Sequence, residues 1–262
     1  MNKVLIVGAN GFIGRHLCGA YLSDSWCVDG VVHRNSDAVP NGVASFSLEE
    51  LEKSSCSYDL IILAAGNFRS DPTGLLVTNV TIPQKIIRRF PDSNIIFISS
   101  IAVYGTHKDT IIPHSAFQNP GQYGLSKIAG EFIVSTHKFG TSIRLSNVYG
   151  YGMNKDLFIA KAIEQARTSG KVTLFGDGSR VQDYIYIRDA VRLIHAVSLS
   201  TKTGIYLGAS GVPLTNSEVA ESICTIIPNT RIVKAGSDQS KSLRVNPQDT
   251  LDAFGFSCEY SL

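Results

Sequence analysis

Two side chains with acid–base capacity, Tyr123 and Lys127, stand four positions apart in the sequence. On a helix, that spacing places both side chains on one face. A free tyrosine has a pKa of about 10, and a nearby ammonium group favours the phenolate and lowers that value. The pair could therefore pass a proton to or from a substrate oxygen. The same spacing also occurs on helix faces that meet only solvent.

Two serines precede this pair at the end of an apolar run, where residues 95–98 are followed by Ser99 and Ser100. The run has the character of a buried strand. A hydroxyl at the end of such a strand could hydrogen-bond the same substrate oxygen as Tyr123 and fix its geometry.

A glycine-rich turn lies close to the N-terminus, where an apolar run over residues 4–7 meets Gly8, Gly11 and Gly14. An amphipathic stretch follows from residue 15 to residue 22. This order predicts a strand, a tight turn and a helix whose first N–H groups and dipole could bind a diphosphate. An ordinary strand–turn–helix with glycines for packing is the alternative. The residues expected to contact a dinucleotide here are Gly8, Asn10, Gly11, Phe12, Ile13 and Gly14.

Together these motifs resemble the short-chain dehydrogenase/reductase superfamily, and more narrowly its extended branch, which modifies sugar nucleotides. Three further segments support that branch, namely Ser99–Gly105, Arg144–Gly150 and Phe175–Ala190. The resemblance runs in the expected order from residue 2 to about residue 257.

The resemblance implies roles for the catalytic set. Tyr123 would exchange a proton with a sugar oxygen, and Lys127 would also hold the nicotinamide ribose. Ser100 is preferred over Ser99 as the substrate-binding serine because its distance to Val103–Gly105 matches the family. Ser99 would then lie closer to the cofactor.

The end of the second apolar strand bears on cofactor choice. It carries His33 and Arg34 and no carboxylate for a ribose 2′-hydroxyl, which favours NADP(H) over NAD(H). A surface arginine is the alternative. Leu63, Ala64 and Ala65 end the third strand and are expected beside the cofactor. Asn79 is expected either near the cofactor or as a simple helix N-cap.

On the substrate side, the resemblance implies that Asn147 and Arg180 reach the nucleotide diphosphate, for which a planar guanidinium is well suited. Phe175 is expected to line the site of the nucleotide base. Sugar-nucleotide dehydratases of this superfamily carry a Thr in place of Ser100, followed by acidic residues, whereas here Ile101 and Ala102 follow Ser100. The resemblance therefore disfavours dehydration.

Apolar and amphipathic segments alternate along the first part of the chain. Strands are expected at 3–8, 27–32, 59–64, 94–99 and 141–146, and helices at 12–23, 48–54, 79–90 and 122–138. This alternation predicts an α/β fold, a doubly wound parallel Rossmann-type sheet with a small C-terminal substrate-binding region. The dinucleotide-binding domain is expected over 1–150, with 188–210 returning to it, and the substrate-binding region over 151–187 and 211–262.

Composition narrows the classes of protein. The chain has 262 residues, 44% of them hydrophobic, and a net charge of +2, so nothing in it calls for nucleic acid or a membrane as a partner. The five cysteines are scattered without a Cys-x-x-Cys pair, which predicts no metal site and a reducing cytoplasmic compartment.

The leading functional hypothesis is an NADPH-dependent reductase of a nucleotide-activated 4-keto-(deoxy)sugar. One alternative is an NAD-dependent nucleotide-sugar 4-epimerase, which uses the same residues and returns its hydride to the substrate. Another is a non-catalytic dinucleotide-binding regulator, against which the Tyr123 and Lys127 pair counts. The resemblance also implies a homodimer. Members of this branch commonly continue into a last helix after a segment like residues 254–262, where this sequence stops, so the resemblance does not define the back of the substrate pocket.

Overall fold

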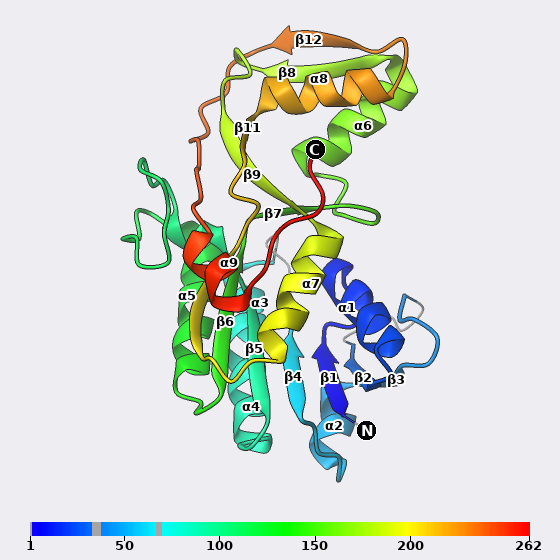
Figure 1. Cartoon of the computed structure of the whole chain (residues 1–262), viewed down its shortest axis with the longest axis vertical. Coiled ribbons are helices and arrows are strands. Elements are labelled where there is room, and N and C mark those ends of the chain that lie inside the picture. Colours follow the sequence, from blue (N-terminus) through cyan, green and yellow to red (C-terminus); the bar gives the residue numbers. More distant parts are fainter. Residues whose placement is uncertain (1, 33–37, 67–69) are drawn as a thin grey trace.

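A computed structural model of the chain describes residues 2–32, 38–66 and 70–262. It has two parts, a large sheet flanked by helices and a smaller cap that lies beyond one end of that sheet (Figure 1). The carboxyl ends of the sheet's strands point toward the cap, which is where open α/β sheets bind ligands.

The large sheet contains seven strands in the order β10-β6-β5-β4-β1-β2-β3, and every neighbouring pair is parallel. The order runs outward in both directions from the β1–β4 pair, so this is a doubly wound sheet, and the predicted fold class is confirmed. The strands are β1 (Lys3–Val7), β2 (Cys27–Val31), β3 (Ala44–Phe46), β4 (Leu60–Leu63), β5 (Asn94–Ser100), β6 (Gly140–Leu145) and β10 (Gly204–Gly208).

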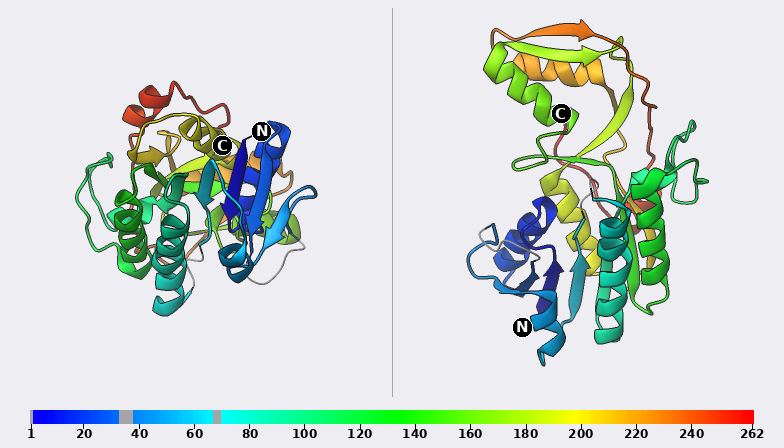
Figure 2. Two further views of the ribbon diagram at one scale, coloured as in Figure 1. Left: turned by 90° about the horizontal axis from the view of Figure 1, so that it is seen from below. Right: turned by 180° about the vertical axis from the view of Figure 1, so that it is seen from behind.

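Helices cover both faces of this sheet (Figures 1 and 2). Alternate residues of one strand serve the two faces, since Val4 and Ile6 join one apolar cluster and Leu5 and Val7 join the other. This two-sided burial explains why the strands are continuous apolar runs. The flanking helices are α1 (Phe12–Ser23) and α7 (Ile187–Ser198) on the first face and α2 (Leu48–Lys53), α4 (Ile82–Arg89) and α5 (Gly121–Ser135) on the second.

The helical region after β4 differs from the single helix expected over 79–90. It begins at α3 (Pro72–Leu76), passes through a π-helical turn, η1 (Val77–Thr81), and continues as α4. Asp71 caps α3 by accepting a hydrogen bond from the Gly74 N–H. Asn79 therefore lies inside a helical run, and its N-cap interpretation is wrong.

The cap has its own apolar core, which includes Ile159, Leu174, Tyr184 and Val219. A three-stranded sheet in the order β11-β9-β7 leads into it, and β12 pairs with β8 above α6 and α8 (Figure 1). These elements are β7 (Asn147–Tyr149), α6 (Phe158–Ser169), β8 (Lys171–Phe175), β9 (Val181–Tyr186), β11 (Pro213–Thr215), α8 (Asn216–Ile226) and β12 (Arg231–Ala235).

The chain returns twice from the cap to the large sheet. Helix α7 leads back to β10, in the region expected to return, and α9 (Gln248–Phe254) packs against β10. Helix α9 falls within residues 211–262, which are expected to belong to the substrate-binding region. Helix α9 lies with the sheet because the buried Thr250 hydroxyl accepts a hydrogen bond from the Leu207 N–H on strand β10. Over the described ranges, none of the helices is both long and apolar enough to cross a bilayer.

Candidate active site

The glycine turn between β1 and α1 is shaped by close approaches. Gly8 has φ +90°, and a Cβ there would lie 2.7 Å from the backbone of Ala65, which follows β4. A Cβ on Gly14 would lie 2.0 Å from the Gly8 carbonyl oxygen. The turn therefore folds onto the β1–β4 switch point of the sheet only if both positions lack side chains.

Helix α1 presents open donors to this turn. Gly11 is its N-cap and offers no side-chain cap, and no acidic residue stands in its first turn. The first backbone bond into the helix runs from the Arg15 N–H to the Gly11 carbonyl, so the N–H groups of residues 12–14 precede the helical ladder. These donors and the helix dipole fit the diphosphate of a dinucleotide.

Ser100 and Tyr123 meet at the carboxyl end of β5. Ser100 caps the short 3₁₀ turn η2 (Ile101–Tyr104), and its hydroxyl oxygen accepts a hydrogen bond from the Ala102 N–H at 3.2 Å. Its side chain also hydrogen-bonds Tyr123 at the start of α5. Gly124 permits this meeting, because a Cβ there would lie 2.4 Å from the Ala102 carbonyl oxygen.

Lys127 lies one helical turn beyond Tyr123 and is buried. Its Nζ donates to the Ile98 carbonyl at 2.8 Å and lies 5.8 Å from the centre of the Tyr123 ring. A Cβ on Gly66 would lie 3.5 Å from the same nitrogen. The ammonium group thus stands between the ends of β4 and β5, beside the segment that carries Ala64 and Ala65.

Burial controls the two acid–base groups. It raises the pKa of Tyr123 to about 12, although the hydrogen bond with Ser100 opposes the rise. It also lowers the pKa of Lys127 to about 7, against the attraction of Glu131. The expectation that the ammonium group would lower the pKa of Tyr123 is therefore wrong here, because loss of solvent dominates. Tyr123 is a neutral phenol at pH 7 and can donate a proton.

Ser99 is used differently from the expectation. Its side chain points to the opposite face of β5 from Ser100, as strand alternation requires. The Ser99 hydroxyl donates to Glu131 at 2.5 Å and is buried. That hydroxyl is committed to the protein interior, so only the backbone of Ser99 remains available to a cofactor. Leu63 likewise has a buried side chain, and its backbone lies at the carboxyl end of the central strand β4.

Asn79 is fully buried in the η1 turn. Its Nδ2 donates to the Ser126 hydroxyl at 2.9 Å, and Ser126 in turn donates to the Tyr123 carbonyl. The side-chain oxygen of Asn79 has no hydrogen-bond partner within the described residues. The residue thus lies directly against the helix of Tyr123 and Lys127.

The three residues expected to bind substrate are spread along the cap. Asn147 lies in β7, where its Nδ2 donates to the Asp183 carbonyl at 2.9 Å. Arg180 donates through Nε to the Lys241 carbonyl, and its Nη1 lies 3.9 Å from Asp238. Asn147 pairs with Tyr184, and Arg180 is four residues earlier, so about 13 Å of strand separates them. Phe175 ends β8 and is 60% exposed.

The positions that bear on cofactor choice, His33 and Arg34, lie outside the described residues. The open first turn of α1, the Gly8–Ala65 approach and the Lys127 ammonium group all fit a nicotinamide dinucleotide. No cluster of three or more metal-ligating side chains occurs in the described ranges.

Comparison with known proteins now identifies the family. The family model described as "NAD dependent epimerase/dehydratase family" matches residues 4–206, well over half of the chain. The chain belongs to this family. The resemblance inferred from the sequence is thereby confirmed, and with it the expectation of a nicotinamide-dependent enzyme.

Two relatives match this chain at 26% identity. An uncharacterized UDP-glucose epimerase of Bacillus subtilis (strain 168) is 26% identical over 231 residues, which is 74% of this chain and 72% of that protein. The N-acetyl-alpha-D-glucosaminyl-diphospho-ditrans,octacis-undecaprenol 4-epimerase of Escherichia coli O157:H7 is 26% identical over 74% of this chain and 62% of its own length.

Its fold also matches solved structures. The ADP-L-glycero-D-manno-heptose-6-epimerase of Helicobacter pylori aligns with a TM-score of 0.88, covering 99% of this chain and 92% of that protein. Sequence identity is 18%, so this similarity shows the fold.

The sequence reasoning about this epimerase/dehydratase family member missed one group at the site. Glu131 and Arg144 form a buried ion pair behind Ser100 and Lys127. Two signals could have found it, because Glu131 continues the Tyr123–Lys127 row by one more helical turn and Arg144 is a charged residue between Ile143 and Leu145 in an expected strand.

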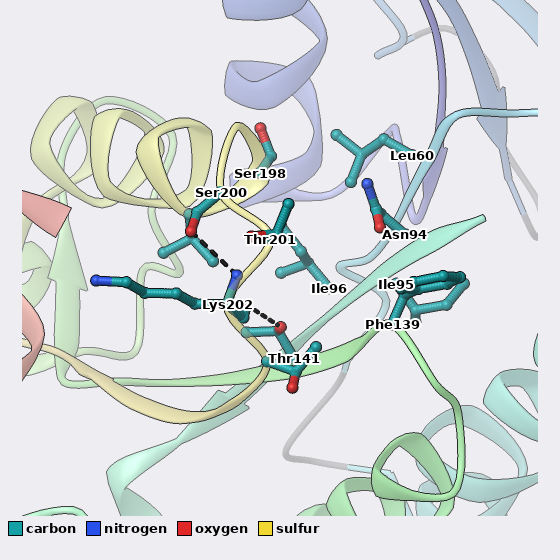
Figure 3. A pocket seen from close by; sticks show the side chains of 12 residues that line it. Leu60, Asn94, Ile95, Ile96, Phe139, Thr141, Ser198, Ser200, Thr201 and Lys202 are labelled. Carbon is teal, nitrogen blue, oxygen red and sulfur yellow. Dashed lines mark hydrogen bonds between the residues drawn. The ribbon is translucent and has the colours of Figure 1, made fainter. Parts of the chain in front are cut away.

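A pocket at the opposite end of the sheet is no rival site. Leu60 and Asn94 at the starts of β4 and β5 line it with Ser198 and Lys202 (Figure 3). Its volume is about 20 Å³, roughly the space of one water molecule.

Proposed function

We propose that this protein is an NADPH-dependent reductase of a nucleotide-activated 4-keto-(deoxy)sugar. One observation carries the proposal, namely the neutral Tyr123 phenol hydrogen-bonded to Ser100 beside a buried Lys127. Reduction of a ketone needs a proton donor at the carbonyl oxygen, and a tyrosine with a raised pKa holds that proton at pH 7.

Each residue has a defined part. Ser100 hydrogen-bonds the ketone oxygen, Tyr123 donates its proton to that oxygen, and Lys127 holds ribose hydroxyls and stabilises the developing phenolate. A bound nicotinamide supplies the hydride. Asn147 and Arg180 hold the nucleotide diphosphate and Phe175 covers the base, which commits the cap to the nucleotide end of the substrate.

The choice of NADPH over NADH rests on Arg34 and on the absence of an Asp or Glu from residues 31–34, at the end of the second apolar strand of the sequence. Arg34→Ala should weaken NADPH binding by roughly 1–3 kcal/mol, the range of a charge-assisted hydrogen bond, and leave NADH binding nearly unchanged. Fluorescence titration of both cofactors measures this. Equal losses for the two cofactors, or a native preference for NADH, would contradict the choice.

A 4-epimerase is the second candidate, favoured by the names of the two relatives described above. The two activities differ in cofactor balance. A reductase consumes one NADPH for each 4-keto nucleotide sugar reduced, whereas an epimerase interconverts 4-hydroxyl sugars with no net change in nicotinamide absorbance. Incubating the native protein with both substrate classes decides between them. If the protein binds the dinucleotide but forms neither a reduced sugar nor an epimerised sugar, the alternative of a non-catalytic dinucleotide-binding regulator is favoured.

A homodimer and a cytoplasmic location complete the proposal. Leu125 and Phe132 are exposed on α5, and Leu76 and Val77 are exposed beside it on α3 and η1. Such a patch on neighbouring helices supports a contact between two copies. Sedimentation of the native protein and of Phe132→Glu tests the dimer.

The scattered cysteines, all free, support a reducing compartment.

A further inference from the structure

One buried guanidinium group contacts helix α5, which carries Tyr123 and Lys127, and the segment that leads from Ser100 to that helix. Arg144, on β6, pairs with both carboxylate oxygens of Glu131, with its Nε at 2.8 Å from Oε1 and its Nη2 at 2.7 Å from Oε2. The two side chains are only 3% and 5% exposed. This is the bidentate geometry that makes an arginine–carboxylate pair directional.

The third guanidinium nitrogen holds the loop between Ser100 and Tyr123. Arg144 Nη1 donates to the Tyr104 hydroxyl at 2.6 Å and to the Pro113 carbonyl at 2.9 Å. The Tyr104 hydroxyl also donates to that carbonyl. The guanidinium lies 5.3 Å from the ring centre of Phe117, farther along the same loop. The loop that delivers Tyr123 is thus held at its middle.

The carboxylate of Glu131 extends the network to the other two catalytic residues. It accepts a hydrogen bond from the Ser99 hydroxyl, and Ser99 directly precedes Ser100 on β5. Glu131 also stands one helical turn from Lys127 on α5 and is a charge that acts on it. The four segments that this pair joins are the end of β5, the η2 turn, loop 105–119 and helix α5.

We propose that Arg144, acting through Glu131 and the Pro113 carbonyl, is a positioning residue that sets the relative placement of Ser100, Tyr123 and Lys127. The inference rests on the proposed function, since it concerns the residues given catalytic parts there. Arg144 acts indirectly. Within the described ranges, its side-chain hydrogen bonds go to Glu131, Tyr104 and Pro113, and none goes to a proposed catalytic residue itself. Lysine cannot replace it, since one ammonium group lacks the planar fork.

The test compares Arg144→Lys with Arg192→Lys. Arg192 makes an arginine–carboxylate pair with Asp189 at 2.8 Å and with Glu259 at 2.7 Å, remote in the sequence from the loop and β5. Arg144→Lys should lower kcat by roughly 10–100-fold, because misplacement by about 1 Å costs on that order. The KM for the nucleotide sugar and the Kd for the dinucleotide should stay within about 3-fold, and Arg192→Lys should leave kcat within about 2-fold.

A second measurement needs no substrate. Amide hydrogen exchange over residues 106–118 should be at least about 10-fold faster in Arg144→Lys than in the native chain and unchanged in Arg192→Lys. Native-like exchange in this loop overturns the inference whether or not turnover is found. If the native protein turns over no nucleotide sugar, the proposed function fails, and hydrogen exchange alone still decides whether Arg144 orders these segments.

The double variant Glu131→Leu/Arg144→Met removes both charges and keeps the volume, so it should fold even where a single change does not. A pair needed only for stability would leave kcat in this variant near the native value, and that result overturns the inference. A positioning role predicts the same 10–100-fold loss of kcat as in Arg144→Lys, with a native-like melting temperature.

Discussion

The sheet side and the cap side of the candidate site hold their polar residues in different ways. On the sheet side, Lys127, Glu131 and Arg144 are at least nine-tenths buried and each has a defined partner. On the cap side, Phe175 is 60% exposed, and the Arg180 side chain is 30% exposed with a carbonyl and a distant carboxylate as partners.

In the proposed function, this difference separates chemistry from recognition. The residues proposed to act on the ketone are fixed by burial before substrate arrives, which is the condition for preorganised catalysis. The residues proposed to bind the nucleotide lie on a cap that packs around its own core, so they can vary without disturbing the sheet. Changes on the sheet side should therefore act on kcat, and changes on the cap side on KM.

The largest expected effect is on the sheet side. Lys127→Met removes the amine nitrogen that lies 5.8 Å from the centre of the Tyr123 ring and keeps the buried volume. Turnover should fall by about 10²–10⁴-fold, the usual range for acid–base assistance, and dinucleotide affinity should also fall. Steady-state kinetics and fluorescence titration measure the two losses. Lost turnover with unchanged dinucleotide affinity would mean that Lys127 acts on the protonation of Tyr123 and does not bind the dinucleotide.

Stability should depend on pH through the same residue. The pKa of Lys127 is lowered from 10.5 to about 7 in the folded protein, so between pH 7 and 10.5 the unfolded chain binds more protons. The unfolding free energy should rise with pH across this window, by on the order of a few kcal/mol. Lys127→Met should remove that rise. Denaturant unfolding of both proteins at pH 7 and 9.5 measures the change in unfolding free energy between the two pH values. An equal change in the native protein and in Lys127→Met would contradict the burial argument.

Glycines on one helix give a matched pair. Gly14→Ala places a Cβ 2.0 Å from the Gly8 carbonyl oxygen, whereas Gly19→Ala meets nothing within 4 Å. The first change should destabilise the protein by about 1–3 kcal/mol and weaken dinucleotide binding. The second should stabilise it by about 0.5–1 kcal/mol, because alanine favours a helix interior. Similar effects at both positions would show that the turn is not tightly packed.

The smallest expected effect is on the cap side. Arg180→Ala removes one guanidinium that reaches the proposed diphosphate and costs about 1 kcal/mol. The KM for the nucleotide sugar should rise by roughly 5-fold, with kcat unchanged. Steady-state kinetics at saturating dinucleotide measures both. A fall in kcat with unchanged KM would remove the division between sheet and cap.

Much of the sheet side could be predicted from the sequence because its signals are local. Glycine spacing after a first apolar run indicated the β1–α1 turn, and the Tyr123–Lys127 spacing indicated a shared helix face. The alternation of apolar runs located the five main strands expected.

What escaped prediction depends on contacts between distant residues. Asn79 lies in a π-helical turn, where its buried side chain meets Ser126, 47 residues away. The Glu131–Arg144 pair joins a helix to a strand, and the short β7, β11 and β12 strands pair only within the cap. The raised pKa of Tyr123 follows from burial, which no local pattern reports.

The most direct test of the central claim is Tyr123→Phe in a nicotinamide absorbance assay with 4-keto nucleotide sugars. Phenylalanine keeps the buried ring and removes only the hydroxyl that hydrogen-bonds Ser100. If Tyr123 donates the proton, turnover should fall by about 10²–10⁴-fold while dinucleotide affinity stays within about 2-fold of native. Near-native turnover in Tyr123→Phe, with any keto-sugar that the native protein reduces, would contradict the account.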